Sequence, residues 1–226
     1  MNSAFHNILI TLLSFVYVFG VVGVMDFFVK KGLSQDISRK VVHIAAGSWL
    51  LFWPLFDHSH WTKFLNISPA LIWTFLLLLK GFTAKPDDKA VKTMTRTGDR
   101  KELLRGPLYF TIVMNVMGTV FFYSVAAIVS MGFLSWGDGL APVVGKKFGR
   151  HKYKILSEKS LEGSLAFFFF GIIGCVLFSL ILLGKVDFGF ILITSAVTTL
   201  VEGFSPANWD NIFIPASAML VSYFYL

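Results

Sequence analysis

The sequence predicts an all-α membrane protein, a bundle of about eight transmembrane helices that form one domain over residues 1–226. Hydrophobic residues make up 55% of the chain and charged residues only 15%, whereas an average soluble domain carries roughly 25% charged residues. A soluble protein of this size could not cover so much apolar surface, because its exterior must stay largely polar. The bilayer is therefore the expected solvent.

Apolar runs give the expected helices, since about 20 apolar residues span the hydrocarbon core. The run near the N-terminus exceeds a signal-peptide core of roughly 7–15 residues, so we expect it to be retained as a helix. The stretch 107–144 is too long for one helix, and two helices that meet near Tyr123–Ser124 would fit it. The remaining candidate spans are about 5–29, 41–56, 68–82, 161–183, 188–203 and 211–226.

Most basic residues fall in three clusters, around 30–40, 80–105 and 146–159. The positive-inside rule places such clusters on the cytoplasmic side, which requires an even number of helices between successive clusters. This requirement supports the split of 107–144 and predicts that both termini lie outside. The clusters also account for the net charge of +7 without nucleic acid, because no soluble basic face with exposed aromatics is present.

One long polar segment, at about 83–106, carries acids among its bases. We expect either a solvated cytoplasmic loop or a flexible lid over a site.

The first chemical signal is Asp138, which lies in an otherwise apolar run near the cytoplasmic end of a helix. An ionisable group there is costly and marks a functional site by default. Its surroundings suggest a smooth helix face for a nucleotide and countercharge for its phosphates, the alternative being helix packing through glycines with a solvated basic end. The candidates are Gly137, Gly139, Gly145, Lys146, Lys147 and Gly149.

The second signal is the run Ser157–Ser164. Ser157 would be the N-cap of a helix with Glu158 in its first turn. Lys159 opposes the helix dipole there, a conflict that an anion bound by Lys159 and free amides would explain. Glu162 lies one turn beyond, where it would need a metal or cation partner or an i,i+3 pair with Lys159. The remaining candidates are Ser160, Gly163 and Ser164.

Two further segments reach the same expected face. Glu202 and Asp210–Asn211 border a loop without basic residues, which suggests metal binding or proton abstraction, unless Asp210 is only a helix N-cap. Arg39 and His43 lie one turn apart, so His43 could bind a phosphate or carry a proton; headgroup anchoring by Arg39 is the alternative. P-loop, Rossmann and nucleophile-elbow motifs are absent from the sequence.

Together these residues resemble a known family. The Gly137-Asp138-Gly139 segment, the GKKFG run at 145–149 and the KSLEGS run at 159–164 are similar to the signature of CTP-dependent lipid kinases, which include dolichol, phytol, farnesol and diacylglycerol kinases. The early RKxxH and the late DNxxxP runs, which begin at Arg39 and Asp210, resemble the phytol kinase branch. The family is related to CDP-diacylglycerol synthase, whose long C-terminal signature this sequence lacks.

The resemblance implies transfer of the terminal phosphoryl group of CTP to a long-chain isoprenoid alcohol at the cytoplasmic membrane face. Asp138 would hold Mg²⁺ with Glu202 or Asp210, and Lys146, Lys147 and Lys159 would neutralise phosphates. Either Asp210 or Glu202 would accept the alcohol proton. The expected partners are membrane lipids, the alcohol and the nucleotide. A cytidylyltransferase that makes a CDP-lipid and a CTP-dependent diacylglycerol kinase are the alternatives, and a transporter without nucleotide turnover is a third class.

Overall fold

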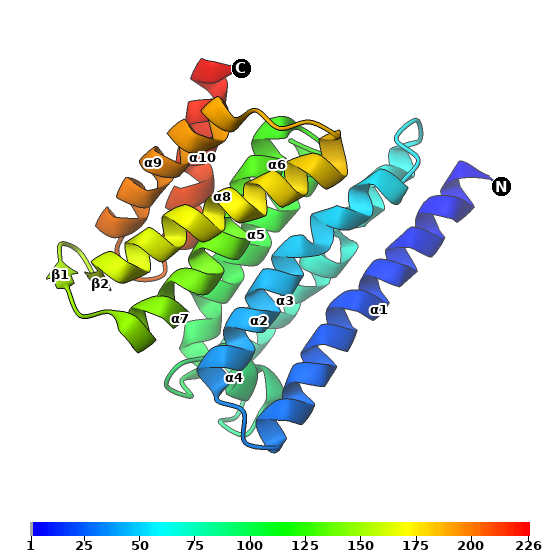
Figure 1. The fold of residues 1–226 in the computed structure, drawn as a ribbon. Helices are drawn as coiled ribbons and strands as arrows, with labels where there is room; N and C mark the ends of the chain where they lie inside the picture. The colour runs from blue at the N-terminus through cyan, green and yellow to red at the C-terminus, as the bar shows by residue number, and fades with distance from the viewer. Residues whose placement is uncertain (1) are drawn as a thin grey trace. The chain divides into compact units, whose positions relative to one another are not determined.

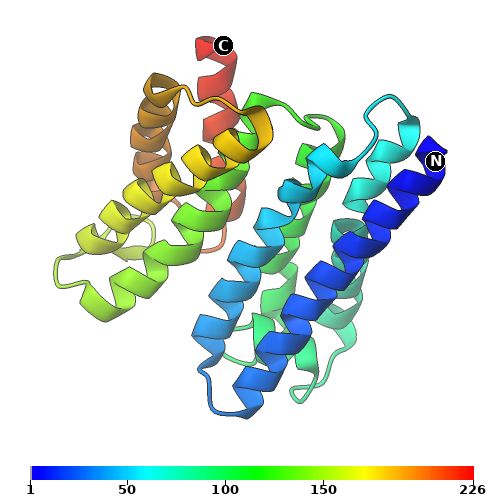
Figure 2. The ribbon, with the colours of Figure 1, turned by 45° about the vertical axis from the view of Figure 1, so that its right-hand side comes forward.

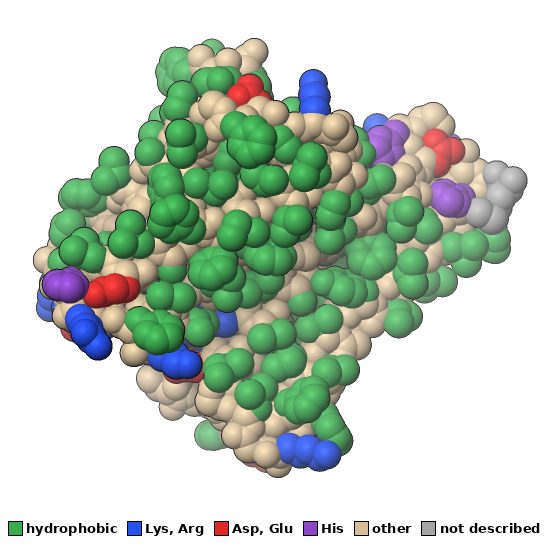
Figure 3. All heavy atoms as spheres, in the orientation of Figure 1, with side chains coloured by type: hydrophobic (Ala, Val, Ile, Leu, Met, Phe, Trp, Pro, Cys, Tyr) green, Lys and Arg blue, Asp and Glu red, His purple; other side chains and the backbone are tan. Residues whose placement is uncertain are grey.

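The computed structural model describes residues 2–226 and confirms the all-α class (Figure 1). The chain forms two compact units, Met1–Phe122 and Tyr123–Leu226. Four helical segments among the described residues are long and apolar enough to cross a membrane, namely Ser3–Lys30, Trp61–Thr83, Val125–Phe148 and Leu161–Leu183. Hydrophobic side chains cover the visible surface along the first and last of these (Figure 3), as expected for helices that face lipid.

The first unit consists of helices and short 3₁₀ segments. Its α1 and α2 run side by side, as Figures 1 and 2 both show in blue. The elements are α1 (Ser3–Lys30), α2 (Gln35–Gly47), η1 (Ser48–Leu55), η2 (Trp61–Ile67), α3 (Ser68–Thr83), α4 (Lys89–Met94), η3 (Arg100–Leu104) and α5 (Gly106–Thr119).

The second unit contains the expected site residues apart from Arg39 and His43. Its last two helices pack as an antiparallel pair, orange and red in Figure 2. The elements are α6 (Val125–Gly132), the π-helical turn η4 (Phe133–Gly137), α7 (Asp138–Phe148), β1 (Lys152–Lys154), β2 (Glu158–Ser160), α8 (Leu161–Leu183), α9 (Phe188–Phe204) and α10 (Asp210–Tyr225).

The expected split of 107–144 is confirmed. Helix α5 ends at Thr119 and α6 begins at Val125, and Tyr123 between them takes a left-handed conformation with φ of 60°. Ser124 caps α6 because its hydroxyl accepts the backbone N–H of Ala127 at 3.1 Å. The bounds of α8 match the predicted span at 161–183.

Two predictions for the first unit need correction. The span at 41–56 is not one helix, because the α-helix gives way to the 3₁₀ segment η1, which contains Pro54 and so lacks one backbone donor. The polar segment 83–106 is not merely a solvated loop. It contains α4 and η3, and it buries Val91 and Leu103 completely against Leu77.

An ion pair also fixes that segment. Lys80 at the end of α3 binds both carboxylate oxygens of Asp88, at 2.8 and 2.9 Å. Burial would raise the pKa of Asp88, but Lys80 and the amides of α4 outweigh it and hold this pKa below its ordinary value. The segment is therefore a folded part of the first unit.

Helix α8 packs closely against the continuous segment α6–η4–α7 through glycines. A Cβ on Gly171 would lie 2.4 Å from the ring of Phe133, and one on Gly174 would lie 2.7 Å from Trp136. Small residues allow such close approach of helices within a bilayer. This pairing fixes the position from which Asp138 begins α7.

Replacing Gly132 by alanine tests this packing. The new Cβ would lie 2.6 Å from Sγ of Cys175 and 2.9 Å from its Cα, and overpacking of this kind costs about 1–3 kcal/mol. Thermal unfolding in detergent should show a lower midpoint for Gly132→Ala. The matched control is Gly20→Ala in α1, where no atom lies within 4 Å of the new Cβ. Equal losses in both variants would contradict the packing.

Candidate active site

Asp138 is held by an irregular turn. Its backbone N–H bonds to the carbonyl of Phe133, five residues back, which closes the π-helical turn Phe133–Gly137. Such turns often occur at functional sites, because the extra residue redirects the side chains that follow. Asp138 is the first residue of α7 and is only 4% exposed. The sequence predicts that this aspartate is functional, but no sequence pattern predicts the π turn.

The segment before α8 corrects a second prediction. Residues Glu158–Ser160 form a strand that pairs antiparallel with Lys152–Lys154, and α8 begins only at Leu161. The N-cap is therefore Ser160, whose hydroxyl accepts the N–H of Gly163 at 3.1 Å, and not Ser157. Because Lys159 lies in a strand, the conflict with a helix dipole does not arise.

Lys159 and two acids form a buried ion-pair network. Its ammonium group binds Oε1 of Glu202 in the last turn of α9, and it lies 3.7 Å from Oδ2 of Asp210 at the start of α10. Glu202 is 3% exposed and the side chain of Lys159 is 18% exposed. The structure thus brings together residues that are separated by more than forty positions.

Asp138 belongs to the same cluster. Burial alone would lower the pKa of Lys159, but the negative charges of Glu202, Asp210 and Asp138 outweigh it and hold this pKa above its ordinary value. The charges of all three carboxylates therefore act on the Lys159 ammonium group. The structure thus brings Lys159, Glu202 and Asp210 into contact, with Asp138 close enough to act on Lys159 electrostatically. That these four residues form one site, and what each does chemically, stay predictions.

Two acceptor oxygens in this region have no hydrogen-bond partner although they are fully buried. They are Oε2 of Glu202 and Oδ1 of Asn211. Asn211 donates its backbone N–H and its amide to Oδ1 of Asp210, at 3.1 and 3.2 Å. The N-cap of α10 is Trp209 and Asp210 is the first residue of the helix, so the alternative that Asp210 is only the N-cap is wrong. A buried acceptor without a donor is costly unless a ligand supplies one.

The glycines of the motif pack helix against helix. A Cβ on Gly145 would lie 3.0 Å from Oγ of Ser160 and 3.4 Å from Cα of Gly163, so α7 and α8 approach at these residues. A Cβ on Gly149 would lie 2.2 Å from the carbonyl oxygen of Gly145, and one on Gly137 3.1 Å from the ring of Phe167. Gly139 is buried in α7. These positions agree with the packing alternative, and a nucleotide face along them stays a prediction.

Glu162 does not join the cluster. Its carboxylate accepts the backbone N–H of His151 at 3.2 Å and contacts the histidine ring nitrogen at 2.8 Å. It therefore closes the base of the hairpin, and the expected pair with Lys159 is not formed. Ser164, two residues later, shares a hydrogen bond with the hydroxyl of Tyr153, and its predicted role in anion binding stays a prediction.

The basic residues at the end of α7 are exposed. Lys146 and Lys147 lie in its last turn, and the ammonium of Lys147 sits 5.2 Å from the centre of the Phe148 ring. Lys152 donates to the carbonyl of Gly145 at 3.2 Å. Lys146 and Lys147 are therefore exposed to solvent, and their predicted binding of phosphates stays a prediction.

Arg39 and His43 lie in α2 of the first unit. Arg39 pairs with Asp36 at 3.7 Å, and the His43 ring lies 4.2 Å from the ring of Phe110, centre to centre. Their predicted roles in nucleotide binding stay predictions.

Tyr153 is the residue that sequence reasoning missed. Its hydroxyl reaches both Ser164 and the neighbourhood of Gly203. The sequence places Tyr153 six residues before Lys159, and this spacing becomes informative only when the hairpin is known, because the two residues are then paired across it.

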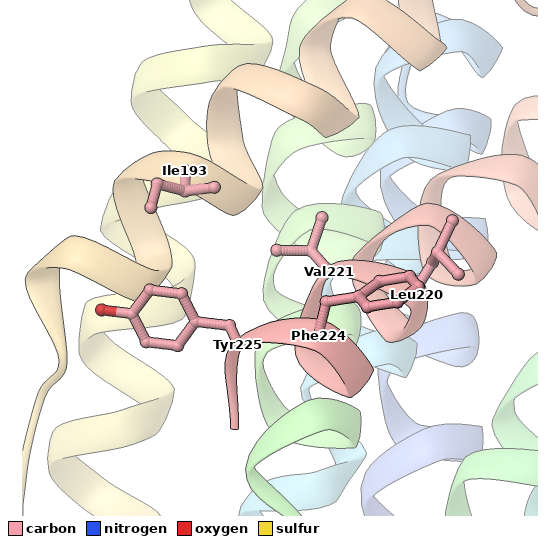
Figure 4. Close-up of a pocket in the computed structure, with 5 residues that line it drawn as sticks. All are labelled: Ile193, Leu220, Val221, Phe224 and Tyr225. Carbon is pink, nitrogen blue, oxygen red and sulfur yellow. The ribbon is translucent and has the colours of Figure 1, made fainter.

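An apolar groove of about 300 Å³ lies at the opposite end of α9 and α10 from Glu202 and Asp210 (Figure 4). Its lining contains no charged residue, and the figure shows these side chains projecting from the first half of α9 and the last turns of α10. They are Ile193, Leu220, Val221, Phe224 and Tyr225.

Several proteins that are similar to this chain are plant proteins named as phytol or farnesol kinases. A probable chloroplastic phytol kinase 1 of Glycine max is 33% identical over 85% of this chain and 68% of its own length. The chloroplastic phytol kinase 1 of Arabidopsis thaliana is 31% identical over 84% of this chain and 67% of its own. A chloroplastic farnesol kinase of Arabidopsis thaliana is 36% identical over 69% of this chain and 54% of its own. No family model and no solved structure matches the chain.

The charge balance of the cluster predicts how Lys159 affects stability. Replacing Lys159 by methionine removes the ammonium partner of the buried Glu202 carboxylate, which should lower the free energy of unfolding by about 3–5 kcal/mol at neutral pH. Lys154→Met, which changes an exposed lysine of the same hairpin, is the control and should have little effect.

The pH dependence has a definite sign. The pKa of Lys159 is higher in the folded than in the unfolded state. The ion pair therefore contributes its full stability below the unfolded pKa of about 10.4, and this contribution is lost as the pH rises through the folded pKa. Chemical unfolding followed across alkaline pH should therefore show a smaller loss for Lys159→Met than for the parent protein. The same alkaline loss in both would contradict the ion pair.

Proposed function

This chain belongs to the phytol and farnesol kinase family, and on that premise we propose that it transfers the terminal phosphoryl group of CTP to a long-chain isoprenoid alcohol. The observation that carries the proposal is the buried cluster of Asp138, Glu202 and Asp210 around Lys159, with exposed lysines at the end of α7. Phosphoryl transfer needs mainly positioning and charge neutralisation, and this cluster offers both signs of charge.

The reaction can be written with these residues. The alcohol oxygen attacks the terminal phosphorus, the bond from phosphorus to the bridging oxygen breaks, and the nucleoside diphosphate leaves. The alcohol proton passes to a carboxylate. Lys159 faces the developing charge, and Lys146 and Lys147 bind the outer phosphate oxygens from solvent.

Glu202 suits the role of proton acceptor better than Asp210. Its Oε2 is buried and has no hydrogen-bond partner, so it has a lone pair to offer. Oε1 of Glu202 binds Lys159 and Oδ1 of Asp210 accepts two N–H groups from Asn211, so the difference between the two acids is this unbonded Oε2 of Glu202.

The residues fit a magnesium ion that arrives with the nucleotide. Among residues 2–226 no group of three or more His, Cys, Asp or Glu side chains is close enough to form a protein-only metal site. Mg²⁺ usually binds through one or two carboxylates together with substrate phosphates. Asp138, with Glu202 or Asp210, would hold it, and it would neutralise charge on the transferred phosphoryl group.

The acceptor alcohol is apolar except for its hydroxyl group. We expect its chain to stay in the bilayer, beside the lipid-facing helices, while the hydroxyl reaches Glu202 at the end of α9 and Asp210 at the start of α10. We expect this site to face the cytoplasm, because the positive-inside rule favours that side for the basic segment at 146–159.

Labelled nucleotide tests the reaction type. Purified protein in lipid nanodiscs is given CTP labelled at the γ or at the α phosphate, with phytol, farnesol or diacylglycerol. Label should reach phytol or farnesol only from the γ position, with release of CDP. Transfer from the α position would indicate a cytidylyltransferase, transfer to diacylglycerol alone would indicate the alternative kinase, and no transfer to any lipid would contradict the proposal.

Asp138→Asn tests the site. Loss of a buried carboxylate that would hold the metal–nucleotide complex should lower kcat at least about a hundredfold, while the unfolding midpoint stays close to that of the parent. The control is Asp187→Asn, because asparagine can still cap α9 at its far end through Phe190. Retained turnover in Asp138→Asn would remove Asp138 from the site.

A further inference from the structure

The hairpin places Tyr153 and Lys159 opposite each other. In the antiparallel register of β1 and β2 the Cα atoms of these two residues are partners. Directly opposed residues of an antiparallel pair project from the same face. Both side chains therefore point toward the C-terminal turn of α9, where Lys159 binds Glu202.

Tyr153 contacts two helices, α8 and α9. Its hydroxyl shares a hydrogen bond of 2.6 Å with the hydroxyl of Ser164 in α8. A Cβ on Gly203 in α9 would lie 2.9 Å from the same tyrosine oxygen, so only glycine leaves room for it there. Gly203 directly follows Glu202, the partner of Lys159.

The hairpin is anchored at its base and at its turn as well. At the base, Glu162 accepts from His151, and Lys152 donates to the carbonyl of Gly145. At the turn, the hydroxyl of Ser157 donates to the carbonyl of Ser205 at 2.8 Å. Between these points Tyr153 is the one side chain of β1 that is not exposed. It determines how closely the middle of the hairpin approaches α9.

We propose that Tyr153 is a positioning residue, whose hydroxyl, bonded to Ser164 and packed on Gly203, holds the hairpin so that Lys159 stays between Glu202 and Asp210. Without that contact the middle of the hairpin can move away from α9 and carry Lys159 with it. The catalytic consequence rests on the proposed function of Lys159 as the group that neutralises phosphate charge. The geometric part stands apart from catalysis and can be measured separately.

Amine acylation measures the position of Lys159 directly. An acylating reagent must reach the amine, and the Lys159 side chain is only 18% exposed while its ammonium group is bonded to Glu202. Tyr153→Phe removes the hydroxyl and keeps the ring. We expect a brief pulse of acetic anhydride, read by peptide mass spectrometry, to modify Lys159 between about twofold and about tenfold faster in Tyr153→Phe, the effect of one lost hydrogen bond.

Three further variants make this test specific. Ser164→Ala removes the other partner and should raise the acylation rate by a similar factor, and the double variant should add little beyond either single one. Tyr225→Phe is the matched control, because it removes a tyrosine hydroxyl that contacts Asp187 at the far end of α9 and α10. The exposed Lys154 is the internal reference in every sample. An unchanged Lys159 rate in Tyr153→Phe would overturn the proposal.

Kinetics then separate positioning from binding of the lipid. In Tyr153→Phe we expect kcat with CTP and phytol to fall between about twofold and about tenfold, with an unchanged KM for phytol. If Lys159 is acylated faster while kcat stays normal, the catalytic role of Lys159 is refuted, but the anchoring of the hairpin by Tyr153 stands. If kcat falls while the acylation rate of Lys159 stays normal, the anchoring of the hairpin by Tyr153 is refuted.

Discussion

The buried pair of Lys159 and Glu202 is the interaction on which the second unit depends for its site. It joins the connection between α7 and α8 to the connection between α9 and α10, because Lys159 lies in the hairpin and Glu202 in the last turn of α9. A buried ion pair adds little net stability once both charges have left water, but losing one partner is strongly destabilising. The presence of this buried pair is therefore better explained by where it holds the two charged groups than by its contribution to stability alone.

That pair can form only because the helices around it approach closely. Glycines at 132, 137, 145, 171 and 174 let α8 lie against α6, η4 and α7 with side chains or backbone of one helix filling the space left by the other. The approach sets where α7 begins, and the π turn then directs Asp138 toward the charges of Lys159 and Glu202. Packing and site geometry are thus one constraint, since widening the contact between α7 and α8 would also move the acid.

Charge and hydropathy predict the all-α membrane class and the break near Tyr123. They also predict the association of Asp138, Lys159, Glu202 and Asp210, because burying an ionisable group in an apolar chain is costly in free energy, which limits where such groups can lie. They did not predict the hairpin. Strands of three residues are too short to show an alternating pattern, so Ser157 and Glu158 were assigned to a helix that begins only at Leu161. Pairing of Glu162 with His151 depends on that hairpin and was beyond prediction for the same reason.

The hairpin also changes the argument for the proposed nucleotide. If Lys159 lay in the first turn of a helix, its conflict with the dipole would call for an anion. In a strand the conflict vanishes, and what remains is that Glu202, Asp210 and Asp138 all act on the ammonium group of Lys159 with their negative charges. An anion alone would add another negative charge beside these acids. Under the proposed function, a divalent cation bound to the phosphates would add positive charge among the acids, and the phosphate oxygens would face the exposed lysines of α7.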